Sequence, residues 1–232
     1  MAFTLSLPTT RLARMVMAAA MFSGIFVAPQ FSNVVGLGSS NALAQGQSNP
    51  DWWKRQGWLT NFDLTSVNYQ SILSGGPPKD GIPSIDKPIF EPIEAIKNLE
   101  DTEPVIGLSI NGDMRAYPLS VLTWHEIVND TVGGVPVAVT YCPLCNAAIV
   151  FERTLNGKAV EFGTTGKLRR SDLIMYDRDT ESWWQQFSGE AIVGDALGTK
   201  LKVVPSRLES YANFKARAES GKVLVPNNPQ FR

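Results

Sequence analysis

The chain has 232 residues, with 21 basic and 22 acidic side chains and a formal net charge of −1. This balance provides no basic face for nucleic acid, and the length suits one domain with a substantial core. Only two cysteines are present, which excludes a disulfide-rich scaffold.

The N-terminus has the pattern of a secretory signal peptide. Two arginines in the first 14 residues precede an apolar run, MVMAAAMFSGIFVA, which is too short to remain as a membrane-spanning helix. Ala42 and Ala44 fit the small-residue cleavage pattern, so we expect residues 1–44 to be a signal peptide and Gln45 to begin the mature protein. The sequence therefore predicts a Sec-exported periplasmic or secreted protein without a stable membrane anchor after cleavage. An uncleaved anchor is the alternative.

Residues 45–74 are predicted to be an N-terminal extension of a single β-rich domain over residues 75–232. The stretch 74–92 is dense in glycine and proline, which favours an extended loop over a helix. We expect the extension to pack on the domain because it contains three closely spaced tryptophans, Trp52, Trp53 and Trp58.

Strand-like segments dominate from residue 104 onward. Three turn dipeptides that tolerate positive φ punctuate them: Asn111-Gly112, Gly133-Gly134 and Asn156-Gly157. A further short strand is predicted over 172–176, and helices are predicted over 93–99, 119–128 and 208–220, the last with Gly221 as its C-terminal cap. The pattern predicts an α+β fold, predominantly antiparallel β, as a sheet or partial barrel of hairpins with a few short helices.

The single histidine and the two cysteines are the main candidates for chemistry. Cys142 and Cys145 form a C-x-x-C pair at the end of an apolar strand-like run, and His125 lies seventeen positions before the first of them. Thiolate and imidazole are ligands for zinc, copper and iron. We therefore predict one transition-metal site made by Cys142, Cys145 and His125, with copper as the first metal and zinc or iron as the next.

The fourth ligand of such a site has three candidates in the sequence. Met175 would favour Cu(I), whereas the carboxylate of Glu126 or Asp172 would favour zinc or iron. A four-sulfur site within one chain is excluded because there is no second C-x-x-C motif.

Two other interpretations of the cysteine pair stay open. In the oxidising periplasm, a Cys142–Cys145 disulfide would make the protein a metal-free interaction module, although so small a loop constrains the unfolded chain little. A redox-active pair would make it a thiol–disulfide oxidoreductase, but the residues after the motif are strand-like rather than helical. There is no P-loop, dinucleotide-binding turn, HExxH or GxSxG motif, so the sequence indicates no reaction, substrate or partner.

Several longer motifs resemble a known family. The segments RAYPL, WHEIVNDTVGG, PVAVTYCPLC and SDLIMYDR occur here in the order typical of exported bacterial and archaeal proteins catalogued as domain of unknown function 3179. The resemblance runs from about Gly75 to Pro226, and His125 and both cysteines fall within its two most distinctive blocks. It implies an exported protein but no activity. Similar proteins continue past LVPNNPQF with further Tyr-Gly and Asn-Pro-Tyr residues, so this chain is expected to be truncated or shifted at its C-terminus.

Overall fold

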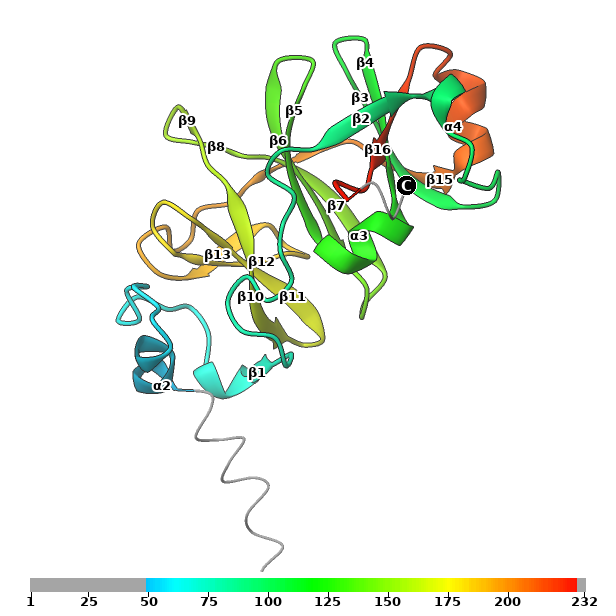
Figure 1. The fold of residues 1–232 in the computed structure, drawn as a ribbon. Coiled ribbons are helices and arrows are strands. Elements are labelled where there is room, and N and C mark those ends of the chain that lie inside the picture. Colours follow the sequence, from blue (N-terminus) through cyan, green and yellow to red (C-terminus); the bar gives the residue numbers. More distant parts are fainter. Residues whose placement is uncertain (1–48, 229–232) are drawn as a thin grey trace, which may run out of the picture. The chain divides into compact units, whose positions relative to one another are not determined.

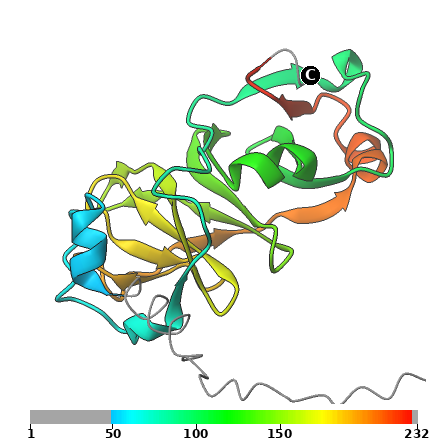
Figure 2. The ribbon, with the colours of Figure 1, turned by 60° about the horizontal axis from the view of Figure 1, so that its bottom comes forward.

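The computed structural model describes residues 49–228 and has an α+β fold dominated by antiparallel strands (Figure 1, Figure 2). The fold-class prediction is therefore confirmed. The predicted signal peptide and its cleavage site lie outside the described residues. Within residues 49–228, no helix is both long enough and apolar enough to cross a membrane.

Helices are short and connect the sheets or cover them. The described helical segments are α2 (Pro50–Arg55), η1 (Tyr69–Ser71), η2 (Ile93–Ala95), α3 (Leu119–His125) and α4 (Tyr211–Arg217).

One five-stranded sheet lies beside α4 and has the order β15-β3-β4-β16-β2. Its β3–β4 hairpin turns at Asn111 and Gly112, both with positive φ, as predicted. Strands β16 and β4 pair in parallel, and the other neighbours in this sheet are antiparallel. The strands are β2 (Ile89–Pro92), β3 (Pro104–Ile110), β4 (Asp113–Pro118), β15 (Arg207–Ser210) and β16 (Lys222–Val225).

A four-stranded sheet with the order β14-β7-β6-β5 forms the middle of the fold. The β5–β6 hairpin turns at Gly133 and Gly134, as predicted. Gly133 is required there because its φ is +53° and an added Cβ would lie 2.2 Å from the carbonyl oxygen of Ile110. The strands are β5 (Ile127–Val132), β6 (Val135–Cys142), β7 (Ala147–Glu152) and β14 (Lys202–Val204).

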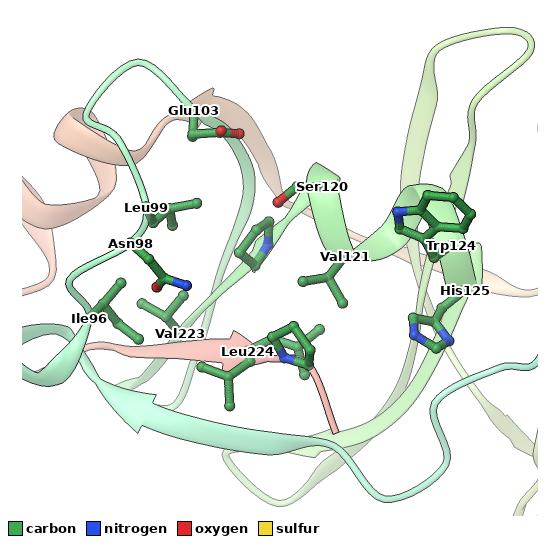
Figure 3. A pocket seen from close by; sticks show the side chains of 13 residues that line it. Ile96, Asn98, Leu99, Glu103, Ser120, Val121, Trp124, His125, Val223 and Leu224 are labelled. Carbon is green, nitrogen blue, oxygen red and sulfur yellow. The ribbon is translucent and has the colours of Figure 1, made fainter. Parts of the chain in front are cut away.

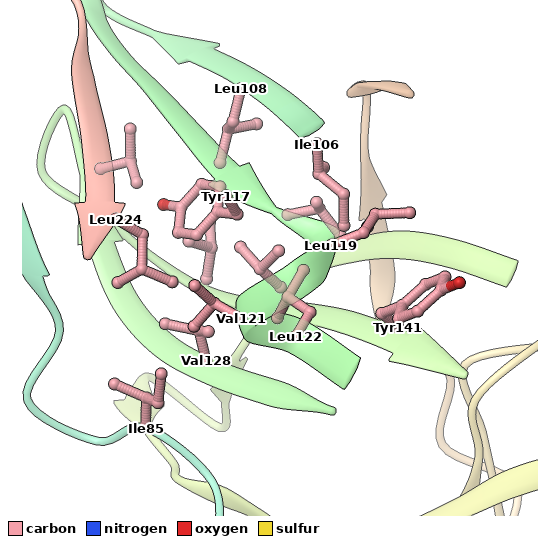
Figure 4. Close-up of a cluster of buried hydrophobic side chains, with 14 residues drawn as sticks. Ile85, Ile106, Leu108, Tyr117, Leu119, Val121, Leu122, Val128, Tyr141 and Leu224 are labelled. Carbon is pink, nitrogen blue, oxygen red and sulfur yellow. The ribbon is translucent and has the colours of Figure 1, made fainter. Parts of the chain in front are cut away.

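Strand β6 serves two separate cores because successive side chains point to opposite faces of a sheet. Val137, Val139 and Tyr141 join a cluster that includes the buried side chains of α3 (Figure 4). Ala138 and Cys142, on the other face, join a cluster with residues of the third sheet. The face on which a β6 side chain lies therefore decides which groups it can meet.

The third sheet has the order β1-β10-β11-β12-β13. Its edge strand β1 comes from the predicted N-terminal extension and pairs with β10. Trp53 and Trp58 are buried, with ring centres 4.8 and 5.0 Å from that of Trp183, so this extension packs on the sheet as expected. The strands are β1 (Ile72–Ser74), β10 (Phe162–Arg169), β11 (Asp172–Asp177), β12 (Trp183–Gln185) and β13 (Glu190–Val193).

The third predicted hairpin is smaller than the sequence pattern indicated. Asn156 and Gly157 do form a turn with positive φ, but it joins only the two-residue strands β8 (Thr154–Leu155) and β9 (Lys158–Ala159). Strand β7 before it pairs with β6 and β14 instead. The longer hairpin predicted around Asn156-Gly157 does not form, because β7 pairs with β6 and β14 in the middle sheet.

The observed helices are shorter than those predicted from the sequence. The helix expected over 119–128 ends at His125, because Glu126 adopts φ +56° and the next residues pair with β6. The helix expected over 208–220 begins at Tyr211, because residues 207–210 form β15 and Ser210 caps the helix. It ends at Arg217 with Ala218 as its cap, so Gly221 does not have the predicted role. Over 93–99 only the 3-10 turn η2 forms.

Candidate metal centre

The C-x-x-C motif forms the tip of the β6–β7 hairpin. Cys142 ends β6 and pairs with Ala147, so a four-residue loop carries Cys145. Asn146 closes this loop with φ +48°; its backbone N–H donates to Pro143 at 3.4 Å, and its side-chain oxygen accepts from the Tyr141 hydroxyl at 3.1 Å. The motif therefore lies at a strand end, as predicted.

The tip of the β10–β11 hairpin meets this loop. Arg169 pairs with Asp172, and the two residues between them, Arg170 and Ser171, have φ of +53° and +65°. Positive φ at both central residues is the geometry of a type I′ turn, which costs non-glycine residues about 1–2 kcal/mol each. The turn places the Ser171 carbonyl 3.7 Å from the Cys142 sulfur, whose thiol donates to it.

Three potential ligand atoms meet between the two hairpin tips. Each residue contributes one atom, and these three atoms, from Cys142, Cys145 and Asp172, lie within 4.8 Å of one another. The Cys145 Sγ lies 3.5 Å from Asp172 Oδ1. A tetrahedral ion with bonds of about 2.3 Å to sulfur and about 2.0 Å to oxygen would hold the two atoms about 3.5 Å apart. The observed separation therefore fits both a thiol–carboxylate hydrogen bond and one edge of a metal site.

The Asp172 carboxylate is oriented by donors on its other side. Its Oδ2 accepts from the Gln185 side-chain amide and, at 2.9 Å, from the Phe187 backbone N–H. These contacts leave Oδ1 facing Cys145. Such outer contacts fix the direction of a carboxylate ligand and are a regular part of metal sites.

Gln186 provides a second buried polar group beside the cysteine hairpin. Its side-chain amide donates to Thr140 Oγ1 at 2.9 Å and to the carbonyl of Ala147 at 3.2 Å. Its Oε1 is buried and accepts no hydrogen bond from any residue in the described range 49–228. Because Ala147 pairs directly with Cys142, the Gln186 side chain is held at the base of the cysteine hairpin, and its unsatisfied acceptor would favour a neighbouring donor or cation.

The electrostatics of the metal-free group favour a neutral Cys145 thiol. Burial, the neighbouring Cys142 thiol and the Asp172 carboxylate raise the pKa of Cys145 to about 12. A redox-active cysteine needs the opposite shift, which a nearby cation or a helix N-terminus provides. Both cysteines are free. A divalent cation would reverse the local balance, because a coordinated thiol loses its proton.

His125 is not a member of this group of ligand atoms among residues 49–228. Helix α3, which ends at His125, packs on the face of β6 that carries Tyr141, whereas Cys142 points to the other face. The His125 Nδ1 lies 2.8 Å from the Pro83 carbonyl oxygen, which can only accept, so Nδ1 carries the proton. The imidazole lines a separate pocket instead (Figure 3).

Comparison with known protein families gives a match that covers most of the described domain. The family model described as protein of unknown function (DUF3179) matches residues 79–232. The chain belongs to this family. The resemblance seen in the sequence motifs is therefore confirmed. Neither a curated protein nor a solved structure matches the chain.

The three candidate fourth ligands of this DUF3179 chain have different positions. Asp172 joins the cysteines. Met175 is fully buried in the same apolar cluster as Cys142. Glu126 caps α3, lies outside the group, and has its pKa raised by burial to about 7. No sequence pattern pointed to Gln185 or Gln186, because their roles depend on contacts between strands.

Proposed function

We propose that the protein is exported to the periplasm or secreted, and that it binds one transition-metal ion through Cys142, Cys145 and Asp172. The observation that carries the proposal is the 3.5 Å separation between Cys145 Sγ and Asp172 Oδ1 within a compact group of ligand atoms. The signal-like N-terminus supports export. The fixed orientation of the Asp172 carboxylate supports a ligand role for that side chain.

The ligand set favours zinc or iron(II) over copper. Two thiolates with one carboxylate suit a borderline divalent ion, whereas Cu(I) prefers sulfur ligands throughout. Copper was the first metal predicted from the sequence, and a ligand set that contains Asp172 makes zinc the better candidate. Three protein ligands leave a fourth tetrahedral position for an exogenous ligand, which is typical of catalytic and transfer sites rather than closed structural ones.

The exposure of the ligands indicates how an ion would reach the site, and the Cys145 thiol is the group that would release a proton on binding. Cys142 and Asp172 are buried, and Cys145 is partly exposed beside Leu144, which is 69% exposed. An ion would therefore reach the site from the side of the loop. Because the Cys145 thiol is neutral without a cation, binding would release a proton from it, so metal affinity should increase with pH.

Elemental analysis and a thiol count on protein purified without chelator test the proposal. We expect about one equivalent of zinc or iron in the wild type. Cys145→Ser should lose the metal, and His125→Ala should keep it. Loss of the metal in His125→Ala would return the histidine to the ligand set. A metal-free wild type with no free thiols would support the disulfide-linked interaction module instead.

A further inference from the structure

We propose that the pocket between α3 and β16 binds a small organic cation with an apolar body. The pocket has a volume of about 560 Å³. This volume lies within the range of small-molecule sites, about 300–1,000 Å³.

Figure 3 shows an apolar trough with polar groups near its ends. The middle is formed by Val121 and by the β16 residue Leu224, with Trp124 and His125 at one end. Asn98 and Glu103 lie toward the opposite side, on the chain between η2 and β3. A ligand that fills the trough therefore needs an apolar middle and a polar group at one end.

The charges that line the pocket select the sign of that polar group. Among the described residues 49–228, Glu103 is the one acidic side chain in the lining, and no lysine or arginine contributes to it. Within the described residues 49–228, the Glu103 carboxylate forms no hydrogen bond or ion pair with another side chain. A carboxylate or phosphate ligand would meet this charge without a compensating cation, whereas an ammonium group would be attracted to it.

The groups at the other end also suit a cation. The Nδ1–H of His125 donates to Pro83, so in the neutral imidazole Nε2 is an acceptor rather than a donor. Trp124 is 76% exposed, and an indole face attracts cations and stacks with aromatic rings. The lining therefore offers acceptors and an aromatic face to a cationic or donor-bearing molecule.

This pocket is independent of the cysteine hairpin. Its α3 wall packs on the Tyr141 face of β6, and Cys142 lies on the opposite face. The second site therefore does not depend on whether the metal proposal is correct. Cys142→Ser should leave binding in the pocket unchanged.

The test compares two probes of matched shape by isothermal titration calorimetry on the purified protein. The cation is 1-naphthylmethylamine, and its anionic counterpart is 1-naphthoate. We expect saturable binding of the amine at one site, about 10-fold tighter than that of the acid. Trp124→Ala should weaken binding of the amine.

A pair of charge variants shows whether the selectivity comes from Glu103. Glu103→Gln should reduce the preference for the amine to less than about 3-fold. Glu100→Gln removes the same charge from an exposed residue outside the lining and should leave the preference intact. Equal binding of the two probes, no saturable binding of the amine, or equal effects of the two variants would overturn the proposal.

Discussion

Asp172→Asn separates the metal-site interpretation from a simple thiol–carboxylate contact. The asparagine keeps the side-chain shape, and its oxygen can still accept from Gln185 and Phe187. The amide nitrogen would then face Cys145 in place of Oδ1, and it offers no lone pair to an ion. The substitution therefore removes one ligand with little change in packing.

The expected loss of affinity is large. Loss of an outer contact to a metal ligand costs about 10–100-fold in affinity, so removal of the ligand itself should cost at least about 100-fold, or about 2.7 kcal/mol. In the metal-free protein, the same substitution should make the Cys145 thiol more reactive. Burial and Cys142 are the larger causes of the raised Cys145 pKa, so loss of the Asp172 charge should lower that pKa but leave it above the usual value of a thiol. Alkylation of Cys145 should then be faster than in the wild type.

Both effects can be measured on the same preparations. Zinc affinity is obtained by competition with a chromophoric chelator, and thiol reactivity by the rate of iodoacetamide labelling at pH 8 after metal removal. Asp179→Asn is the matched control, because it removes the same charge from an exposed turn. Equal zinc affinity in the two variants would refute the argument that Asp172 is a ligand.

Three further predictions concern stability and processing. Trp53→Ala should cost about 3–5 kcal/mol in urea unfolding because Trp53 is fully buried, whereas Trp52→Ala, at a residue 36% exposed in the same helix, should cost less than about 1 kcal/mol; equal losses would contradict the packing described for α2. The pKa of Glu126 is raised from 4.5 to about 7, so the stability of the wild type should fall as the pH increases through this window. Glu126→Gln, which cannot ionise, should be about 1–2 kcal/mol more stable than the wild type at pH 8 and equal to it at pH 4; a gain that does not depend on pH would contradict burial of the carboxyl group. The intact mass of the exported protein should correspond to cleavage before Gln45, and a mass that retains the apolar run would instead indicate a tethered protein.

Local chemistry was sufficient to predict two of the hairpins. Asn111-Gly112 and Gly133-Gly134 turn where expected, because few residue pairs other than these accept positive φ at both positions. Helix boundaries were less predictable, because strand pairing decided them. The residues after Glu126 have a pattern compatible with a helix, but they pair with β6 and complete the middle sheet.

The candidate site was predictable only in part, for a geometric reason. The spacing of Cys142 and Cys145 identified the pair, and Asp172 was one of three candidate partners. Which of His125 and Asp172 lies near the pair depends on the face of β6 against which each element packs. Sequence periodicity shows that a strand has two faces, but it does not show which other segment covers each one.

The ligand atoms come from two different sheets, since Cys142 and Cys145 belong to the β6–β7 hairpin and Asp172 to the β10–β11 hairpin. Each hairpin closes over a short stretch of chain and can form early, whereas the two tips meet only when the sheets dock. An ion bound between the two tips would stabilise the docked sheets after this late step. It would slow unfolding and leave the folding rate nearly unchanged, so its loss would be detected first as a shorter lifetime of the native state.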